Sequence, residues 1–144
     1  QMLKAKERID FAIFTFSQSS GIDDTMLRLL DFGMPIRGVF DGGQGRQKWT
    51  PVQALKAKGA DLSFVNKSGQ LGKLHHKLMV LDGQVVIGGS FNYTGPANNL
   101  NDENIIILGD LDTTSTVQKQ AQKKIAQFAL IEIDRIITDH GSAV

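Results

Sequence analysis

Cysteine is absent from this chain of 144 residues, and histidine, tryptophan and tyrosine occur only three, one and one times. Without cysteine, the chain forms neither disulfides nor the thiolate zinc sites that are common in small domains. No apolar run approaches the roughly 20 residues of a membrane-spanning helix. We therefore expect one soluble domain over residues 1–144, and a hydrophobic content of 41% is enough to build its core.

A large net charge is also missing, because 16 Lys and Arg stand against 15 Asp and Glu for a formal charge of +1. The distribution is uneven. Residues 44–77 contain seven basic residues and one acidic residue, a balance of +6 that leaves −5 for the remainder. Such a segment attracts a polyanion, although the lysines of a solvated helix and loop give the same count. The chain begins at Gln1 rather than at an initiator Met, so we expect its true N-terminus to be missing and leave its compartment open.

A hairpin signal lies at the centre of the chain. Two apolar runs, residues 74–81 and 85–92, are separated by Asp82-Gly83, a dipeptide typical of tight turns between paired strands. Side chains alternate between the two faces of a strand. His75 and Lys77 are therefore expected on one face, and His76 on the other.

Ser90 and Asn92 form the matching pair on the second strand of this hairpin. Together with His75 and Lys77 they suit a tetrahedral phosphate, because neutral imidazole is a nucleophile and an ammonium is a compact cation for phosphate oxygens. Hydroxyl and carboxamide groups donate to charge that grows in the transition state. No cluster of carboxylates and no further His at ligand spacing accompanies them, so we expect neither a metal nor another cofactor.

The chain resembles the phospholipase D superfamily through the signature HxKx4Dx6GSxN, carried here as His75-x-Lys77-x4-Asp82-x6-Gly89-Ser90-x-Asn92. An ordinary buried hairpin with one core histidine is the alternative interpretation. The resemblance implies a metal-independent phosphodiesterase that works through a covalent phosphohistidine. It also implies the α/β fold of that superfamily.

Further roles follow from the resemblance. In nuclease-like members an acidic residue after the signature hydrogen-bonds the catalytic histidine; Glu103 matches that position, and Asp102 is the alternative. A carboxylate on one ring nitrogen fixes the tautomer and leaves the other nitrogen of His75 to attack. Asp82, at the turn, is expected to brace the hairpin rather than act as acid or base. His76 is expected to be structural.

Phosphate and substrate contacts are expected from the signature and from the basic segment that precedes it. The residues are Lys77, Ser90, Asn92, Gly89, Arg46, Lys48 and Lys73. Gly89 would allow the backbone to approach the phosphate closely. The loop that carries Arg46 and Lys48 follows the end of a strand, where open α/β sheets usually bind ligands. An ordinary exposed loop with one packed Trp49 is the alternative.

The order of elements indicates the fold class. Residues 9–16 and 35–41 are predicted strands joined by a helix over residues 22–32, an order that favours parallel pairing. Another strand is expected over residues 61–66. A long helix over residues 116–138 is expected to cover one face of the sheet through an inward stripe of Val117, Ala121, Ile125, Ala129, Ile133 and Ile136. We expect an α/β domain with a mixed, mostly parallel sheet and helices on both faces.

A single imidazole cannot occupy both sides of the phosphorus in an in-line displacement, which needs a nucleophile on one side and a proton donor on the other. The chain has one HxK, whereas the superfamily brings two together. We therefore expect a two-fold homodimer in which both copies of His75 face one phosphate. The rival expectation is one half of a longer chain with two motifs.

The stretches Gly-Ser-Phe-Asn-Tyr-Thr and Asn-Asp-Glu-Asn resemble the short, single-motif endonucleases of the superfamily. The expected substrate is therefore nucleic acid, and the expected activity is hydrolysis of DNA or RNA phosphodiester bonds. A phospholipid substrate is the alternative, for a phospholipase D or one half of a cardiolipin-synthase-like transferase, although no basic membrane-binding helix is evident. A module that binds nucleic acid without cutting it is a third possibility.

Overall fold

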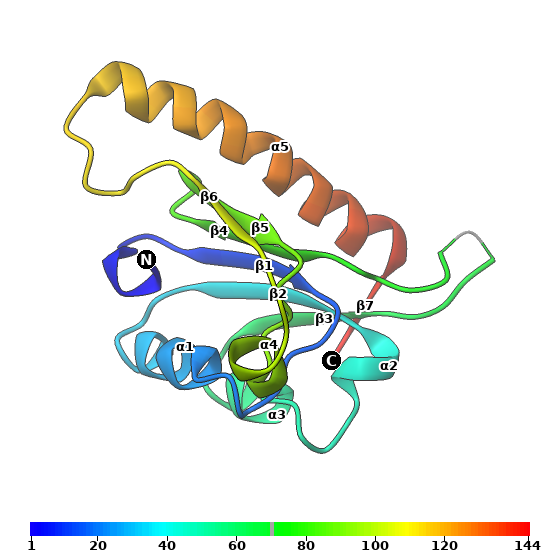
Figure 1. Cartoon of the computed structure of the whole chain (residues 1–144). Helices are drawn as coiled ribbons and strands as arrows, with labels where there is room; N and C mark the ends of the chain where they lie inside the picture. Colours follow the sequence, from blue (N-terminus) through cyan, green and yellow to red (C-terminus); the bar gives the residue numbers. More distant parts are fainter. Residues whose placement is uncertain (70) are drawn as a thin grey trace.

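A seven-stranded sheet forms the centre of the protein (Figure 1). The computed structural model describes residues 1–69 and 71–144. The strands lie in the order β6-β5-β4-β1-β2-β3-β7. Their bounds are β1 (Ile9–Ile13), β2 (Ile36–Asp41), β3 (Asp61–Val65), β4 (Lys77–Leu81), β5 (Val85–Gly89), β6 (Ile105–Leu108) and β7 (Gly141–Ala143).

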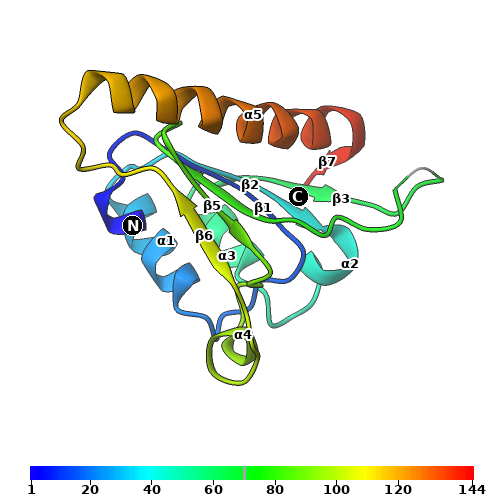
Figure 2. The ribbon, with the colours of Figure 1, turned by 45° about the horizontal axis from the view of Figure 1, so that its top comes forward.

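Helices cover both faces of this sheet, as predicted. The bounds are α1 (Ile22–Asp31), α2 (Gly42–Gly45), α3 (Val52–Ala57), α4 (Gly95–Asn99) and α5 (Thr116–His140), and a 3₁₀ turn occupies Met2–Lys4. Figure 2 shows α5 along one face and α1, α3 and α4 on the other side. Within the described residues, no helix is both long enough and apolar enough to cross a bilayer.

The predicted α/β class with a mixed sheet is confirmed, but the share of parallel pairing is smaller than expected. The two parallel pairs are β1–β2 and β2–β3. The pairs β1–β4, β4–β5, β5–β6 and β3–β7 are antiparallel. Antiparallel pairs therefore outnumber parallel ones in the described part of the chain. The β4–β5 pair is a hairpin and needs no crossover helix, whereas β1–β4 and β3–β7 join segments that lie far apart in the sequence.

The turn predicted at Asp82-Gly83 is confirmed. Both residues have positive φ, 54° and 57°, and Gln84 N donates to Leu81 O over 2.9 Å. Two successive left-handed residues match the twist of the flanking strands, which explains the Asp-Gly pair. This turn fixes the register of β4 and β5, so that Met79 pairs with Ile87.

The core has two parts, one on each side of the sheet. Phe11, Phe40 and Met79 face α1, whereas Val39 and Val80 face α5. Strand β1 is buried throughout, which includes the carboxylate of Asp10. That charge is paired with Arg8 and Arg37, whose nitrogens lie 2.5–2.7 Å from it, and Arg37 also reaches Asp134 in α5 at 2.6 Å. The guanidinium of Arg37 therefore joins β1 to the long helix.

The inward stripe predicted for the long helix is wrong at its N-terminal end. Ile133 and Ile136 are buried as expected, but Val117 is 76% exposed and Ile125 is 47% exposed. A step of four residues turns an α-helix by roughly 40° beyond one full turn, so a stripe built from such steps winds away from the sheet. Ala126, which the predicted stripe omits, is fully buried instead.

Candidate active site

The signature histidine and lysine meet where the chain enters β4. Lys77 Nζ lies 3.3 Å from Nε2 and 3.4 Å from Nδ1 of His75, and 3.0 Å from the His75 carbonyl oxygen. His76 points the other way, with its Nε2 at 3.3 Å from Oε1 of Glu132 in α5. The alternation predicted for these three residues is therefore confirmed, and the exposed imidazole of His75 lies with an ammonium on the face away from α5.

A phenyl ring that sequence reasoning missed supports this pair. The ring centroids of Phe14 and His75 are 4.7 Å apart, and the ammonium groups of Lys73 and Lys77 lie 5.4 and 5.3 Å from the Phe14 centroid. These are distances at which a cation is attracted to an aromatic face. The register of β1 against β4 is the signal that would have found it, because Ile13 pairs with Lys77 and so brings Phe14 beside the histidines.

Ser90 and Glu103 form a second cluster beside the first. The Ser90 hydroxyl donates to Oε2 of Glu103 and accepts from Asn104 N at 3.0 Å, and Asn101 donates to Oε1 of Glu103 at 3.2 Å. The hydrogen bonds of Glu103 among the described residues thus go to Ser90 and Asn101, rather than to His75 as expected. The reason is topological, because Glu103 leads into β6, which pairs with β5 and so passes the residue after Gly89.

Gly89 is required by the neighbouring strand. Its φ is +148°, and a Cβ built on it would lie 2.2 Å from Asn104 O and 3.0 Å from Asn104 C. The sequence predicts a close approach of this backbone to phosphate, whereas the close approach in the structure is to the backbone of Asn104. Glycine therefore sets the distance between the end of β5 and the segment that carries Glu103.

Asn92 is anchored through its carbonyl oxygen. Its Oδ1 accepts from Thr15 N at 3.3 Å, and Tyr93 N donates to Thr15 O at 3.0 Å, so the segment after β1 runs beside the segment after β5. Since a backbone N–H can only donate, the amide of Asn92 must turn its oxygen toward Thr15. No acceptor among the described residues takes its Nδ2 protons, which leaves that group as a donor.

Comparison with known proteins shows the family to which this chain belongs. Residues 1–125 match the family described as "Cardiolipin synthase, PLD-like domain". The chain belongs to the PLD-like family. A mitochondrial cardiolipin hydrolase from Chlamydomonas reinhardtii is 28% identical over 119 residues, which are 83% of this chain and 52% of that protein. The chain thus spans about half the length of the curated relatives that it matches.

Solved structures support the PLD-like fold. Nuc, a phospholipase D family member from Salmonella typhimurium, superposes with a TM-score of 0.78 at 19% identity and covers 99% of this chain and 85% of its own. NucT from Helicobacter pylori gives a TM-score of 0.82 at 15% identity, with 99% and 86% covered. The expectation of a phospholipase D-like fold is confirmed.

The basic segment before the PLD-like signature is only partly directed toward the site. The Arg46 guanidinium donates to Gly42 O at 2.9 Å and to Asn66 Oδ1 at 2.7 Å, and it lies 4.4 Å above the Phe64 ring. These contacts hold Arg46 against α2 and the end of β3, rather than turning it toward His75 as a phosphate ligand. Lys48 is exposed in the same loop.

Two carboxylates, Asp41 and the signature residue Asp82, position the strand that carries the signature. Asp41, which sequence reasoning missed, caps α2 and also accepts from Leu74 N at 3.1 Å, one residue before His75. Asp82, at the other end of β4, accepts from the backbone N–H groups of residues 6–8 at 2.8–3.0 Å. Its carboxylate thereby ties the N-terminal segment to the hairpin. Across the described residues, no three His, Cys, Asp or Glu side chains converge as metal ligands.

The electrostatics around His75 favour the neutral imidazole. Partial burial of the ring lowers the pKa of His75, and the positive charges of Lys77 and Lys73 lower it further. Burial also lowers the pKa of Lys77, against the opposing charge of Glu103. A depressed His75 pKa keeps the nucleophilic form populated at neutral and mildly acidic pH.

Lys73→Gln is expected to raise the pKa of His75 toward its ordinary value, because one of the charges that disfavours imidazolium is removed. The acidic limb of the pH–rate profile then moves to higher pH, and activity falls more at pH 6 than at pH 8. An NMR titration of the His75 ring measures the pKa directly. Lys67→Gln, a charge-matched control in the same loop, should leave that titration unchanged; equal shifts in both variants would show that Lys73 has no particular influence.

Proposed function

We propose that this chain is a metal-independent phosphodiesterase in which His75 attacks phosphorus and becomes a phosphohistidine. Membership of the PLD-like family supports this proposal, and similar proteins are named cardiolipin hydrolase and phospholipase D. The observation that carries the mechanism is an exposed imidazole with a depressed pKa, held between Phe14 and Lys77. A neutral ring nitrogen is able to attack phosphorus, and the adjacent ammonium stabilises the negative charge of the phosphoryl oxygens in the transition state.

The first step forms a bond from a neutral ring nitrogen of His75 to phosphorus and breaks the bond from phosphorus to the leaving oxygen. The leaving oxygen takes a proton from a second, protonated imidazole. In the second step that imidazole accepts a proton from water, the water oxygen attacks phosphorus, and the P–N bond breaks. Lys77 and the Nδ2 donor of Asn92 serve the phosphoryl oxygens in both steps.

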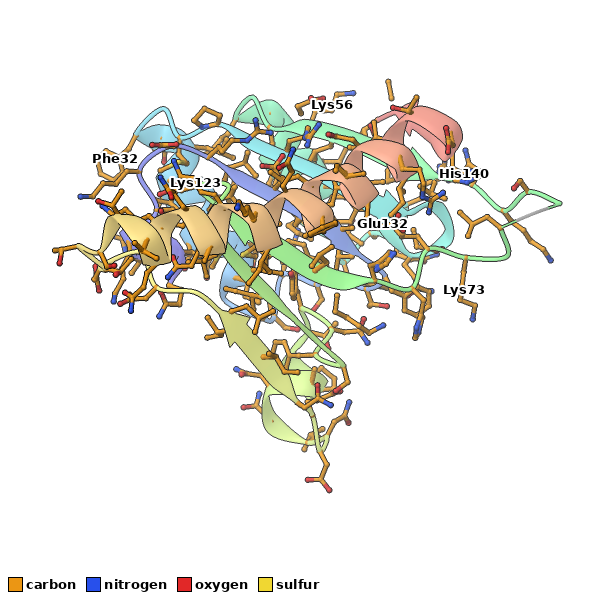
Figure 3. All side chains as sticks on the ribbon, turned by 90° about the horizontal axis from the view of Figure 1, so that it is seen from above. Phe32, Lys56, Lys73, Lys123, Glu132 and His140 are labelled. Atoms are coloured by element: carbon orange, nitrogen blue, oxygen red, sulfur yellow. The ribbon has the colours of Figure 1, made fainter. Side chains whose placement is uncertain are left out.

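The second imidazole is proposed to come from a second copy of the chain. One chain supplies one HxK, so a two-fold dimer with both His75 rings at a shared phosphate completes the machinery. Lys73 projects from the loop before the signature, where a polyanion would approach (Figure 3). With the exposed Lys48, it supports nucleic acid as the proposed substrate and a nuclease as the proposed activity.

The test is turnover in EDTA, measured on plasmid DNA, single-stranded DNA, RNA and phosphatidylcholine, with light scattering on the same sample. We expect nucleic acid to be cleaved without added metal by a protein of twice the chain mass. Denaturation during turnover should trap phosphate on the peptide that contains His75. Activity that requires added Mg²⁺, or a fully active monomer, would contradict the mechanism or the shared site respectively.

A second candidate substrate is a phospholipid, and one specific observation favours it. The site adjoins an apolar pocket that offers almost nothing polar to a nucleotide.

A further inference from the structure

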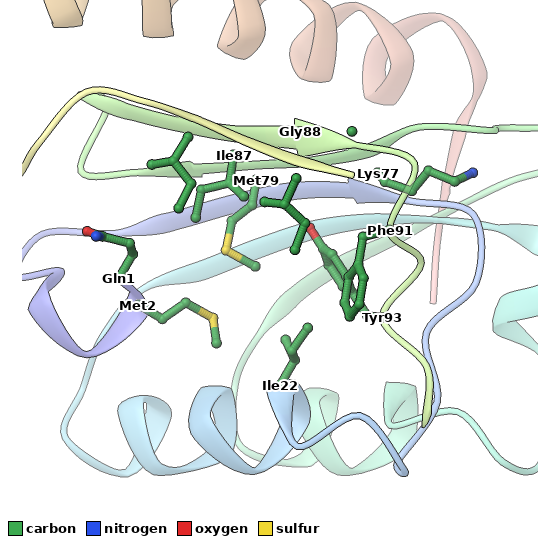
Figure 4. Close-up of a pocket in the computed structure, with 12 residues that line it drawn as sticks. Gln1, Met2, Ile22, Lys77, Met79, Ile87, Gly88, Phe91 and Tyr93 are labelled. Atoms are coloured by element: carbon green, nitrogen blue, oxygen red, sulfur yellow. The ribbon is translucent and has the colours of Figure 1, made fainter. Parts of the chain in front are cut away.

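An apolar pocket of about 230 Å³ lies directly beside the signature (Figure 4). It is lined by the N-terminal residues Gln1 and Met2, by residues of α1, β4, β5 and β6, and by the segment after β5. The apolar residues that matter here are Ile22, Met79, Ile87, Phe91, Ile105 and Ile107. The pocket is on the sheet face opposite α5, because Met79 and Ile87 belong to the core that faces α1.

One polar group points into this pocket without a partner. Tyr93 is only 5% exposed and lines the pocket, and its hydroxyl makes no hydrogen bond to any described residue. Figure 4 shows that hydroxyl directed upward between Met79 and Phe91. Burial raises the pKa of Tyr93 far above its ordinary value, so the phenol stays protonated and is a donor. This hydroxyl opens onto the pocket, so it is a donor available to an acceptor on a ligand bound there.

The pocket begins where the phosphate is proposed to bind. Lys77 and Gly89 line one end of it. In Figure 4 the aliphatic stem of Lys77 borders the pocket while its ammonium points away from it, and that ammonium lies 3.3 Å from Nε2 of His75. Lys77 thus links His75 to the pocket, and a phosphodiester bound at His75 would have to extend its substituent past the stem of Lys77 to enter it.

The chemistry of the pocket lining favours an aliphatic chain over a nucleobase as the substituent of the phosphodiester. A nucleobase has several donors and acceptors on its edge. The lining is mostly isoleucine, methionine and aromatic side chains, with the Tyr93 hydroxyl and the Gln1 carboxamide as polar groups, so most of those donors and acceptors would stay unpaired. An aliphatic chain loses nothing there and gains from leaving water. We propose that the pocket binds one acyl chain of a phospholipid and that Tyr93 donates to the ester carbonyl of that chain. The proposal rests on the proposed function, because it needs phosphorus at His75.

Strand β6 offers a matched pair of variants to test this. Ile107 lines the pocket and is 45% exposed, whereas Ile106 points to the other face of the same strand and is 57% exposed. The substrates are dioctanoyl-phosphatidylcholine below its micelle concentration, bis(p-nitrophenyl) phosphate as a diester without acyl chains, and single-stranded DNA. Ile107→Asp is expected to lower the ratio of kcat/KM on the lipid to that on the chain-free diester by about tenfold or more, since burying even two methylene groups is worth roughly that factor.

Tyr93→Phe is the second variant. It tests whether the Tyr93 hydroxyl contributes to lipid binding independently of any effect on the stability of the fold. Its melting temperature should equal or exceed that of the wild type, because the lost hydroxyl has no partner in the described protein, while the lipid ratio falls. Ile106→Asp should leave the ratio unchanged. Equal ratios in all three variants would overturn the proposal, and so would a loss confined to single-stranded DNA, which would assign the pocket to a nucleobase.

Lipid binding is measured separately from turnover. The acyl-chain pocket and the phosphohistidine mechanism can then be contradicted independently of each other. Titration of dioctanoyl-phosphatidylcholine into His75→Ala protein should show saturable binding that Ile107→Asp weakens about tenfold. If the wild type fails to cleave the chain-free diester, the proposed mechanism is wrong, but the titration still decides the pocket. Absence of saturable binding to the His75→Ala protein would overturn the acyl-chain assignment even if that diester is cleaved.

Discussion

Replacing His75 with alanine is expected to lower phosphodiester turnover by about 10⁴-fold or more. The variant loses the nitrogen atom that forms the bond to phosphorus, and in a two-fold site it also loses the proton donor. Removing a nucleophile or its partner base commonly lowers the rate of such an enzyme by about 10⁴-fold or more. The fold should be retained because the imidazole is exposed and does not belong to the buried core; its ring pairs with Phe14 and its nitrogens with Lys77. Single-turnover rates on bis(p-nitrophenyl) phosphate and a thermal melt measure the two effects.

The neighbouring histidine provides a control one residue away. His76 lies on the other face of the same segment and contacts Glu132 in α5, which also binds Arg135 at 2.8 and 2.9 Å. His76→Ala removes a ring from the helix contact but nothing from the phosphate side, so its rate should stay within about tenfold of the wild type, a small loss that a displaced neighbour explains. If His76→Ala were as inactive as His75→Ala, the assignment of the two faces would be wrong.

Local sequence rules predicted what depends on neighbours along the chain. The Asp82-Gly83 turn, the opposite directions of His75 and His76, and the β1–α1–β2 order each follow from period, turn chemistry or connection handedness, and each is confirmed. The helix over Gly95–Asn99 was missed, although Thr94 and Pro96 form the cap and first turn that signal a helix start. The five residues, which include one Gly, one Pro and two Asn, have little intrinsic helix preference, so their composition alone does not indicate a helix.

Contacts between distant segments could not be predicted in this way. The position of Phe14 under His75 depends on β1 pairing antiparallel with β4, and the hairpin alone does not specify its partner strand. The partner of Glu103 likewise depends on β6 lying next to β5. Sequence identifies the chemistry of the side chains in the site, whereas strand order decides which of them touch. The proposed shared site adds a further contact of this kind, between two copies of the chain.

Gly89→Ala tests whether that strand order sets the geometry of the site. The new Cβ would lie 2.2 Å from Asn104 O, and at a φ of +148° an alanine is strained even without the contact. The backbone of Asn104 must move, which separates Ser90 from Glu103 and disturbs the edge strand. We expect the free energy of unfolding to fall by about 2 kcal/mol or more. Displacement of phosphate ligands by an ångström should lower kcat/KM about 10²-fold.

Gly88, the adjacent glycine, provides a control for Gly89→Ala. Alanine at residue 88 adds a methyl group to β5 without the clash with Asn104. A Cβ on Gly88 would meet its nearest atom, Lys77 O, at 3.7 Å, an ordinary contact, so Gly88→Ala should change the free energy of unfolding by less than about 1 kcal/mol. Urea denaturation and kcat/KM on the same diester compare the two variants. Similar values for both would mean that β6 moves freely away from Gly89, and that Glu103 is not held in place by the close approach of Asn104. A stable but inactive Gly89→Ala protein would instead show that this glycine acts on the phosphate site itself, as the signature alone suggests.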